Sequence, residues 1–369
     1  MINKIKNIID IPPSIVLTSK TQLYFKGGVN MKKFIYIFMS LCLFINIFSI
    51  PTRAVEKNNK LNVNAKCAIA IDSKTRRVLY EKNSDKIVPM ASTTKIITAL
   101  VAIKYGNLED KFIISSNAAS IRGSKVGYKK NDEISLKELI VGLMFKSGND
   151  AAIAIAEGIS GSIEEFCKLM NEYALEIGLM DSNFESPHGL DSGRHYSTSY
   201  DLAIATAKAK ENDFFNEMVG KKEYTSRDNN FTRDYSNINK ILWQIKGANG
   251  VKTGYTGGAG KCLVTSVNNG HNDVIMVVLD CPGRWTETEK IFNYVKENYY
   301  YENIKDLNSM DEESDMSIFN EDIYVPIKNG SKGIFKLDKN NNIVNDNKVL
   351  GDIKVFEDEV LIYKHIIYK

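Results

Sequence analysis

Residues 250–280, "GVKTGYTGGAGKCLVTSVNNGHNDVIMVVLD", indicate the fold class most directly. It contains three short runs, "GVKTGYT", "GKCLVTSVNN" and "DVIMVVLD", of which the last two are alternating or fully apolar. Turn-forming residues, including Gly270 and Asn272, separate these last two runs. Runs of this length and pattern between Gly and Asn residues are typical of β-strands. The stretch therefore predicts three consecutive strands.

A β-hairpin is predicted at the other end of the same segment. The sequence "KCAIAIDSKTRRVLYEKNSD" has alternating runs at 68–71 and 78–81 around a polar turn. Helical patterns lie between the two strand regions, and one more follows them; they occupy about residues 92–105, 136–145, 150–158, 162–178, 200–210 and 286–299. Strands at both ends with helices between them predict an α+β fold. In such a fold helices flank an antiparallel sheet, and we expect the first and last strands to pair.

The composition is that of a folded globular protein. Of the 369 residues, 43% are hydrophobic and 25% are charged. The chain is long enough for one large domain and a small one. Its formal net charge of +3 comes from an excess of lysine and arginine in residues 1–54, so the remainder is slightly acidic. A nucleic-acid partner, which requires a basic surface, is therefore not expected.

Residues 31–54, "MKKFIYIFMSLCLFINIFSIPTRA", have the pattern of a secretory signal peptide. Two lysines precede a long apolar run, and Pro51 and a small-residue ending follow it, which predicts cleavage after Ala54. An uncleaved signal anchor is the alternative, because the run is just long enough to span a membrane. A signal peptide begins at the N-terminus, so we expect Met31 to be the true start and residues 1–30 to be a mis-assigned upstream extension. The protein is then exported, either secreted or attached to the outer face of the cytoplasmic membrane.

The composition changes after residue 305. Residues 306–322 are acidic and poor in apolar side chains, which predicts a linker. Residues 323–369 have short β-branched runs separated by Asn, Gly and Asp, which predicts a small all-β domain. The last residues do not have the pattern of an amphipathic anchor helix, so membrane association is left open. The first domain is expected to span residues 61–305.

Three short motifs in this first domain suggest chemistry. They are Ser92-Thr93-Thr94-Lys95, Ser147-Gly148-Asn149 and Lys252-Thr253-Gly254. Each motif alone has a structural explanation: a helix cap, a turn and a strand end. In this order, they match the signature of penicillin-binding proteins and class A β-lactamases, with Gly148 where that signature has aspartate. The combination favours a catalytic site.

Longer segments around the motifs resemble the serine D-alanyl-D-alanine carboxypeptidases of peptidase family S11, the low-molecular-weight penicillin-binding proteins. The resemblance covers about residues 61–305 and rests on "PMASTTKIITAL", "LMFKSGNDAAIAIAE", "FESPHGLDSGRHYSTSYDLA" and "GVKTGYTGGAGKCLVTS". It implies a β-lactamase/transpeptidase-like fold and removal of the terminal D-alanine from peptidoglycan stem peptides. The implied partners are stems ending in D-Ala-D-Ala, with β-lactams as covalent inhibitors. Such trimming would limit cross-linking of the cell wall.

The first motif would supply the nucleophile and its base. If a helix begins at Ser92, Lys95 lies one turn away on an otherwise apolar face. An amine there either reaches water or is buried, and burial lowers its pKa. A serine hydroxyl needs a nearby base, and the resemblance implies that Ser92 is acylated while Lys95, aided by the positive charge of Lys252, accepts the proton. We therefore expect Lys95 to be a buried, largely uncharged base.

The other motifs would bind substrate and complete the chemistry. The resemblance implies that Ser147 relays a proton toward the leaving group and that Asn149 holds the substrate amide. Lys252 and Thr253, on an edge strand, would bind the terminal carboxylate. Two further contributions come from the backbone: room for substrate at Gly254, and an oxyanion hole of the N–H groups of Ser92 and Tyr255, at about 3 kcal/mol per donor.

No cofactor or metal is expected. His188 and His195 lack the H-E-x-x-H pattern of a zinc peptidase, and "SPHGLDSGRHYS" is expected to be a structured loop instead. The four cysteines after residue 54 lack the short paired spacings of a zinc site. We expect free buried thiols, and a disulfide between Cys262 and Cys281 is the alternative.

Three other functions are compatible with the same motifs: a D,D-endopeptidase, a β-lactamase and a catalytically silent peptidoglycan-binding protein. The sequence shows no Glu-bearing loop like that of class A β-lactamases, which disfavours a fast β-lactam hydrolase. A protein that only binds has no need of the base at Lys95. The carboxypeptidase is therefore the favoured hypothesis.

Overall fold

The computed structural model describes residues 61–310, 321–339, 343–344 and 347–368. The expected upstream extension and signal peptide lie outside the described residues, and so does most of the expected linker, residues 311–320. Within the described ranges, no helix combines the length and the apolar character needed to cross a membrane.

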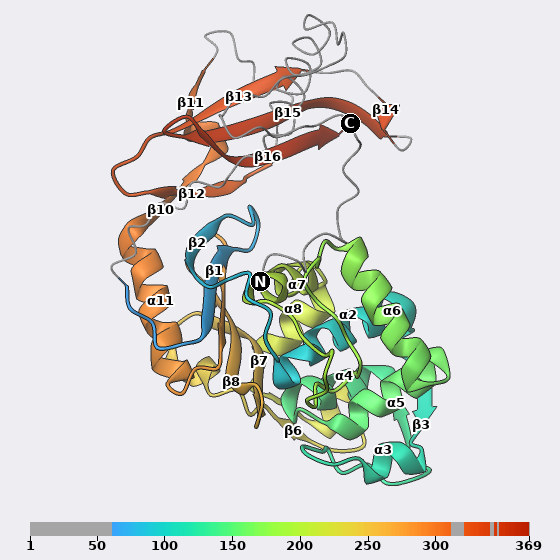
Figure 1. Ribbon diagram of the computed structural model, residues 1–369. Coiled ribbons are helices and arrows are strands. Elements are labelled where there is room, and N and C mark those ends of the chain that lie inside the picture. Colours follow the sequence, from blue (N-terminus) through green and yellow to red (C-terminus); the bar gives the residue numbers. More distant parts are fainter. Residues whose placement is uncertain (1–60, 311–320, 340–342, 345–346, 369) are drawn as a thin grey trace, which may run out of the picture. The chain divides into compact units, whose positions relative to one another are not determined.

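A five-stranded antiparallel sheet lies at the centre of the first domain (Figure 1). Its strand order is β2-β1-β9-β8-β7. The strands are β1 (Cys67–Asp72), β2 (Val78–Lys82), β7 (Ala248–Thr256), β8 (Gly260–Asn268) and β9 (Asp273–Leu279). Ile69 of β1 lies opposite Val277 of β9, so the first and last parts of the segment pair as predicted. The α+β fold class is confirmed, and β7 is an edge strand.

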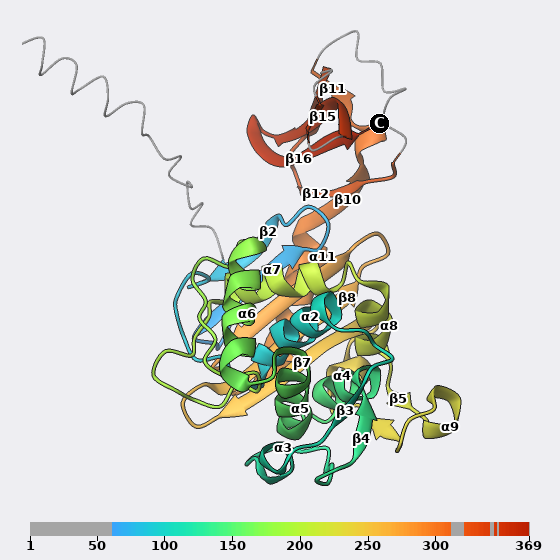
Figure 2. The same cartoon turned by 90° about the vertical axis from the view of Figure 1, so that its right-hand side faces the viewer.

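Helices cover both faces of this sheet (Figures 1 and 2). One face is covered by α11 (Arg284–Asn298). The helices on the opposite face include α2 (Lys95–Tyr105), α4 (Leu136–Phe145), α5 (Asn149–Ser160), α6 (Ile163–Glu176), α7 (Ser199–Ala209) and α8 (Asp213–Gly220). Alternate side chains of a strand point to opposite faces. Accordingly, Ile275 and Val277 of β9 belong to the larger core under these helices, whereas Met276 and Val278 pack with α11.

Polar residues fix where several helices begin. Ser135, Ser162 and Thr198 directly precede α4, α6 and α7, and each side chain accepts a hydrogen bond from the backbone N–H three residues on. Each cap satisfies one N–H group that has no partner inside the helix. These three helices therefore begin at, or next to, the predicted residues.

Short elements between the long helices and strands were not predicted. They are β3 (Lys111–Ile113), α3 (Ser116–Ser120), β4 (Glu133–Ser135), β5 (Glu223–Tyr224), α9 (Ser226–Asn229), β6 (Tyr235–Ser236) and α10 (Ile241–Gln244); the longer α8 was also missed. Elements this short show no periodic pattern. Tertiary contacts hold them instead: the buried Glu138 carboxylate accepts hydrogen bonds from Thr232 and Tyr235.

A second group of strands follows α11. β10 (Tyr299–Asn303) pairs with β12 (Tyr324–Lys328). A further sheet contains β11 (Asn308–Ser309), β13 (Gly333–Lys339), β14 (Ile343–Val344), β15 (Asn347–Glu357) and β16 (Val360–Tyr368). The strand-rich character expected for 323–369 is present. The structure departs from the expected boundary at residue 305, because β10 ends before this residue but pairs with β12, which follows it. Three consecutive tyrosines give β10 a high strand propensity.

Candidate active site

The first motif lies on a 3₁₀ turn, η1 (Ala91–Thr94), which precedes α2. The α-helix begins at Lys95, so Ser92 is not a helix cap; its hydroxyl lies 3.5 Å from the carbonyl oxygen of His188. Ala91 has a φ of 51°, in the left-handed region that side-chain-bearing residues rarely adopt. Strain of this kind persists only where surrounding contacts impose it, and it is frequent at functional turns.

The amine of Lys95 is enclosed among neutral acceptors. Its Nζ lies 2.9 Å from Ser92 Oγ, 2.8 Å from Asn149 Oδ1 and 2.7 Å from the His188 carbonyl oxygen. The side chain is fully buried, with 0% exposure, so it does not reach water. The structure therefore places the amine next to the hydroxyl that the sequence analysis paired it with.

The charged form of Lys95 is disfavoured by its surroundings. Burial is the largest cause that holds the pKa of Lys95 well below the ordinary lysine value, and the positive charge of Lys252 lowers it further. The carboxylate of Asp150 acts in the opposite direction, but its effect is smaller. These directions agree with the expectation of a largely uncharged amine helped by a second cation.

The second motif lies at the start of α5. Asn149 is held from both sides, because its Oδ1 accepts from Lys95 and its Nδ2 donates to the Arg122 carbonyl oxygen at 2.7 Å. Ser147 is buried and has a φ of 57°. In the described part of the chain, its hydroxyl makes no hydrogen bond to Ser92 or Lys95. Among these two residues, the structure joins Asn149 to the Lys95 amine by a hydrogen bond and does not join Ser147 to it.

The third motif forms part of the edge strand β7 and lies beside the first. Lys252 and Thr253 are buried, and Lys252 Nζ donates to the Thr253 carbonyl oxygen at 2.9 Å. A Cβ atom on Gly254 would lie 3.2 Å from Ser92 N, so glycine permits the close approach of β7 to the turn. Tyr255 follows, with a side chain that is 67% exposed.

Arg284, which was not predicted from the sequence, adds another cation beside β7. It is the first residue of α11, and its Nη1 donates to the carbonyl oxygens of Gly254 at 2.8 Å and Cys262 at 3.0 Å. Burial and, second, the charge of Arg284 lower the pKa of Lys252 to about 7. No spacing rule connects the start of α11 to β7, so only the three-dimensional structure reveals this arginine.

The expected loop "SPHGLDSGRHYS" contacts both the turn and the end of β7. The His188 carbonyl oxygen accepts from the Lys95 amine, as described above, and His195 Nε2 lies 2.8 Å from Thr94 Oγ1. Asp191 Oδ1 accepts from Thr256 Oγ1 at 2.6 Å. Burial is the main cause that lowers the pKa of each histidine to about 4, so both are neutral near pH 7. Backbone acceptors such as the His188 carbonyl have no sequence signature.

The four cysteines in the described ranges offer no competing nucleophile. Cys67, Cys167, Cys262 and Cys281 are free and buried, as predicted. Burial raises the pKa of the Cys262 thiol to about 12, so the reactive thiolate is disfavoured. The described ranges contain no group of three or more His, Cys, Asp or Glu side chains placed to hold a metal ion.

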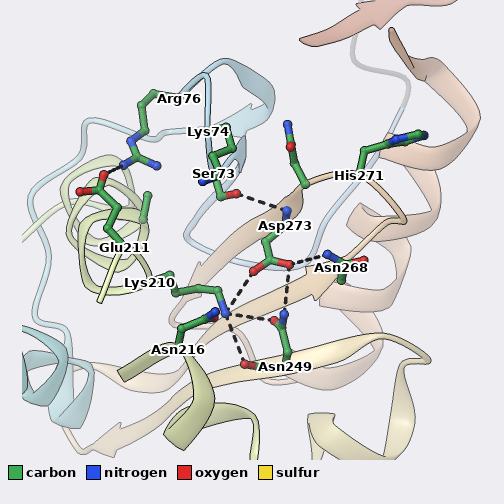
Figure 3. A pocket seen from close by; sticks show the side chains of 12 residues that line it. Ser73, Lys74, Arg76, Lys210, Glu211, Asn216, Asn249, Asn268, His271 and Asp273 are labelled. Carbon is green, nitrogen blue, oxygen red and sulfur yellow. Dashed lines mark hydrogen bonds and ion pairs between the residues drawn. The ribbon is translucent and has the colours of Figure 1, made fainter. Parts of the chain in front are cut away.

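A further lysine, Lys210, has a buried side chain and lines a polar pocket of the same domain (Figure 3). The pocket has a volume of about 390 Å³, and none of the three motifs lines it. Lys210 Nζ lies 3.1 Å from Asp273 Oδ2, while the side chains of Asn249 and Asn268 donate to Asp273 Oδ1 at 3.0 and 3.1 Å. The Lys210 amine and the Asp273 carboxylate are therefore satisfied within this pocket.

Comparison with known proteins gives relatives named D-alanyl-D-alanine carboxypeptidases. A family model described as D-alanyl-D-alanine carboxypeptidase, peptidase S11, matches residues 53–283. The D-alanyl-D-alanine carboxypeptidase DacF of Bacillus subtilis is 39% identical over 229 residues, which are 60% of this chain and 59% of DacF. DacC of Escherichia coli is 34% identical over 267 residues, which are 68% of this chain and 66% of DacC. The chain thus spans less than two thirds of the length of either relative.

Solved structures show the same likeness. The D-alanyl-D-alanine carboxypeptidase DacD from Francisella tularensis superposes with a TM-score of 0.66 at 26% identity, over 84% of this chain and 93% of that one. A mutant of the Streptomyces K15 DD-transpeptidase superposes with a TM-score of 0.60 at 31% identity, over 64% of this chain and 98% of that one. With the family model matching more than half of its length, the chain belongs to the peptidase S11 family of D-alanyl-D-alanine carboxypeptidases.

Proposed function

We propose that the protein is a serine carboxypeptidase that removes the terminal D-alanine from peptidoglycan stem peptides ending in D-Ala-D-Ala. The observation that carries this proposal is the enclosed amine of Lys95, 2.9 Å from Ser92 Oγ and surrounded by neutral acceptors. A serine hydroxyl is a weak nucleophile until a neighbouring base takes its proton. Membership of the family and the names of the relatives support the same substrate class.

Proton counting explains how Lys95 acts as that base. A neutral amine has two N–H groups and one lone pair. Asn149 Oδ1 and the His188 carbonyl oxygen are acceptors only, so they take the two N–H groups. The Asn149 amide is fixed in this orientation because its Nδ2 donates to the Arg122 carbonyl. The lone pair is then left for Ser92, whose hydroxyl donates to it.

Acylation begins when Ser92 Oγ attacks the carbonyl carbon of the penultimate D-alanine and its proton moves to Lys95 Nζ. The oxyanion that forms accepts hydrogen bonds from the backbone N–H groups of Ser92 and Tyr255. The C–N bond then breaks, and the terminal D-alanine leaves with a proton that Ser147 relays from Lys95. An ester on Ser92 remains, and the amine is neutral again.

The carboxylate end of the substrate binds beside β7. Lys252 and Thr253 contact the carboxylate, and Arg284 adds a positive charge next to Gly254. A pKa of about 7 leaves Lys252 partly neutral in the free protein, and a bound carboxylate favours its charged form. Asn149, which already contacts the base, holds the substrate amide.

The second step transfers the acyl group to water. Water attacks the ester, Lys95 takes a proton from it, and the shortened stem leaves as Ser92 regains its hydrogen. A DD-transpeptidase is the second candidate, because the 31%-identical Streptomyces K15 structure carries that name. In that reaction an amine replaces water. The acyl-enzyme is common to both functions, so the product distinguishes them.

Export to the cell wall follows from the proposed substrate. Residues 31–54 have the signal-peptide pattern that supports it. The exported enzyme would limit cross-linking and so influence cell shape. N-terminal sequencing of the exported protein is expected to begin at Val55. A peptide from residues 1–30 in the precursor would contradict a start at Met31.

Mass spectrometry with two ligands tests the enzymatic proposal. Purified protein is incubated with benzylpenicillin and, separately, with a short peptide ending in D-Ala-D-Ala. We expect one penicillin mass added to the tryptic peptide that contains Ser92, and release of D-alanine from the peptide. The Ser92→Ala variant should show neither while keeping its circular dichroism spectrum. An unmodified Ser92 after long exposure would refute the enzyme, and transfer to added glycine would favour the transpeptidase.

A further inference from the structure

The peptide group between Ala91 and Ser92 is hydrogen-bonded at its carbonyl end and closely approached by the chain at both ends. Its carbonyl oxygen, that of Ala91, accepts a hydrogen bond from Thr94 Oγ1 at 2.8 Å. A Cβ on Gly189 would lie 2.1 Å from the same oxygen, and a Cβ on Gly254 would lie 3.2 Å from Ser92 N. Two glycines thus let the loop and β7 approach this one peptide group closely.

His195 contacts the Thr94 hydroxyl, and the tautomer of its ring can be deduced. The backbone N–H of Glu185 donates to His195 Nδ1 at 3.0 Å, so Nδ1 carries no proton. A pKa of about 4 keeps the ring neutral near pH 7. The single proton of the neutral ring is therefore on Nε2. Nε2 lies 2.8 Å from Thr94 Oγ1. Because that hydroxyl gives its own proton to the Ala91 carbonyl, it must accept from His195.

These contacts form a continuous chain from the backbone of Glu185, through the buried His195 and Thr94, to the Ala91 carbonyl. Hydrogen bonds in such chains polarise one another in an interior of low dielectric. Polarising the carbonyl of a peptide group also makes its N–H a stronger donor. Here that N–H belongs to Ser92.

We propose that His195 is a positioning residue that acts through Thr94 to orient and polarise the Ala91–Ser92 peptide, so that Ser92 N–H is a stronger oxyanion donor. The left-handed φ of 51° at Ala91 supports this role, because a strained residue keeps its orientation only under external contacts. The proposal rests on the proposed function, in which an oxyanion forms at Ser92. It assigns His195 no contact with substrate.

Matched substitutions at Thr94 separate the hydroxyl from the bulk of the side chain. Thr94→Val keeps the size and loses the hydroxyl, whereas Thr94→Ser keeps the hydroxyl. We expect acylation by benzylpenicillin to be about tenfold slower in the valine variant, less than the loss of a whole oxyanion donor, and to stay within about twofold in the serine variant. Adding His195→Gln should slow the serine variant but not the valine variant, because Thr94→Val has already removed a link of the hydrogen-bond chain.

The ester carbonyl of the acyl-enzyme gives a spectroscopic reading of the same donor. A carbonyl that accepts weaker hydrogen bonds absorbs at higher infrared frequency. With carbonyl-13C-labelled penicillin, we expect the band to move to higher frequency in Thr94→Val and in His195→Gln, and to stay in place in Thr94→Ser. The melting temperature of each variant is measured alongside.

The outcomes separate this proposal from the proposed function. If the unmodified protein forms no acyl-enzyme, both are overturned. If it is acylated but the valine and serine variants react equally fast, only the positioning role of His195 and Thr94 is overturned. A lower melting temperature in Thr94→Val with an unmoved carbonyl band also overturns that positioning role, because it shows a purely structural one.

Discussion

Two buried lysines of the same domain have opposite surroundings. Lys95 is fully enclosed and contacts a hydroxyl and two carbonyl oxygens. The Lys210 side chain is 4% exposed and lies 3.1 Å from the Asp273 carboxylate (Figure 3). Burial lowers the pKa of both amines, but Asp273 opposes this effect at Lys210, whereas Lys252 adds to it at Lys95.

The difference distinguishes an amine suited to accept a proton from one suited to hold structure. A carboxylate in contact favours the charged ammonium, and the pair fixes α7 against the β8–β9 turn. Neutral acceptors and a second cation favour the uncharged amine, which can take a proton. Burial alone therefore does not mark a base; the identity of its neighbours does.

The largest expected effect is on acylation in Lys95→Met. The variant removes the amine that we propose as the base while keeping the length and burial of the side chain. Loss of a general base typically costs about 100-fold to 10,000-fold in rate, and we expect the upper part of this range because no other amine contacts Ser92 in the described structure. Stopped-flow acylation by a chromogenic β-lactam measures it. A loss below about tenfold would show that Lys95 is not the base.

Lys210→Met is expected to affect stability instead. It leaves the Asp273 carboxylate, whose side chain is only 14% exposed, without its cation. Breaking such a pair should lower the free energy of unfolding by about 3 kcal/mol, while the folded protein is acylated at the normal rate. Urea unfolding and acylation are measured on the same sample.

Lys208→Met is the matched control on α7. Lys208 is 44% exposed and pairs with Glu211 at the surface, so its loss should change stability little. If Lys208→Met and Lys210→Met destabilise equally, the structural role assigned to the Lys210–Asp273 pair is wrong.

The pH dependence of kcat/KM for a D-Ala-D-Ala peptide should have two limbs. As pH falls through the lowered pKa of Lys95, the amine gains a proton and the rate declines, by about tenfold per pH unit at the limit. As pH rises through about 7, free Lys252 loses its proton, and attraction for the terminal carboxylate weakens. Initial rates of D-alanine release across the pH range measure both limbs.

Substrate chemistry tells the two limbs apart. A peptide whose C-terminal carboxylate is esterified should keep the acidic limb and lose the alkaline one, because Lys252 then has no anion to attract. An alkaline limb of equal size with the ester would contradict the assignment to Lys252.

The smallest effect is expected for Gly254→Ala. The new Cβ would lie 3.2 Å from Ser92 N, so β7 must shift by a few tenths of an ångström. Acylation should slow by about fivefold. Moving Lys252 away should also raise the pKa of Lys95, which shifts the acidic limb to higher pH. Gly257→Ala, where a Cβ meets nothing within 4 Å, serves as the control. Equal rates in both variants would show that close packing at Gly254 is unimportant.

Prediction from sequence succeeded where residue type and local order suffice. The strands around residues 250–280 and the capped helices follow from periodicity and capping chemistry, and the first and last strands pair as expected. The three motifs predicted that Ser92 and Lys95 lie together, and the structure places their side chains 2.9 Å apart, while their catalytic roles stay predictions. The contact between Lys95 and Asn149 is consistent with the predicted site.

The other features of the site depend on tertiary contacts that leave no local pattern in the sequence. The His188 carbonyl is a backbone group, Arg284 reaches β7 from a different element, and the left-handed φ of Ala91 comes from its surroundings. A 3₁₀ turn in place of the first helical turn is likewise set by packing. The relay role predicted for Ser147 stays a prediction, because no hydrogen bond in the described structure joins it to the amine.

As the last strand of its sheet, β7 has one backbone edge that no strand of the described sheet covers. A peptide that aligns with this edge is held by its main chain, as an added strand. Main-chain hydrogen bonds do not depend on which side chain a residue carries. We therefore expect an enzyme that is strict about the chirality and the free carboxylate of the last two residues, and tolerant of variation in the residues before them.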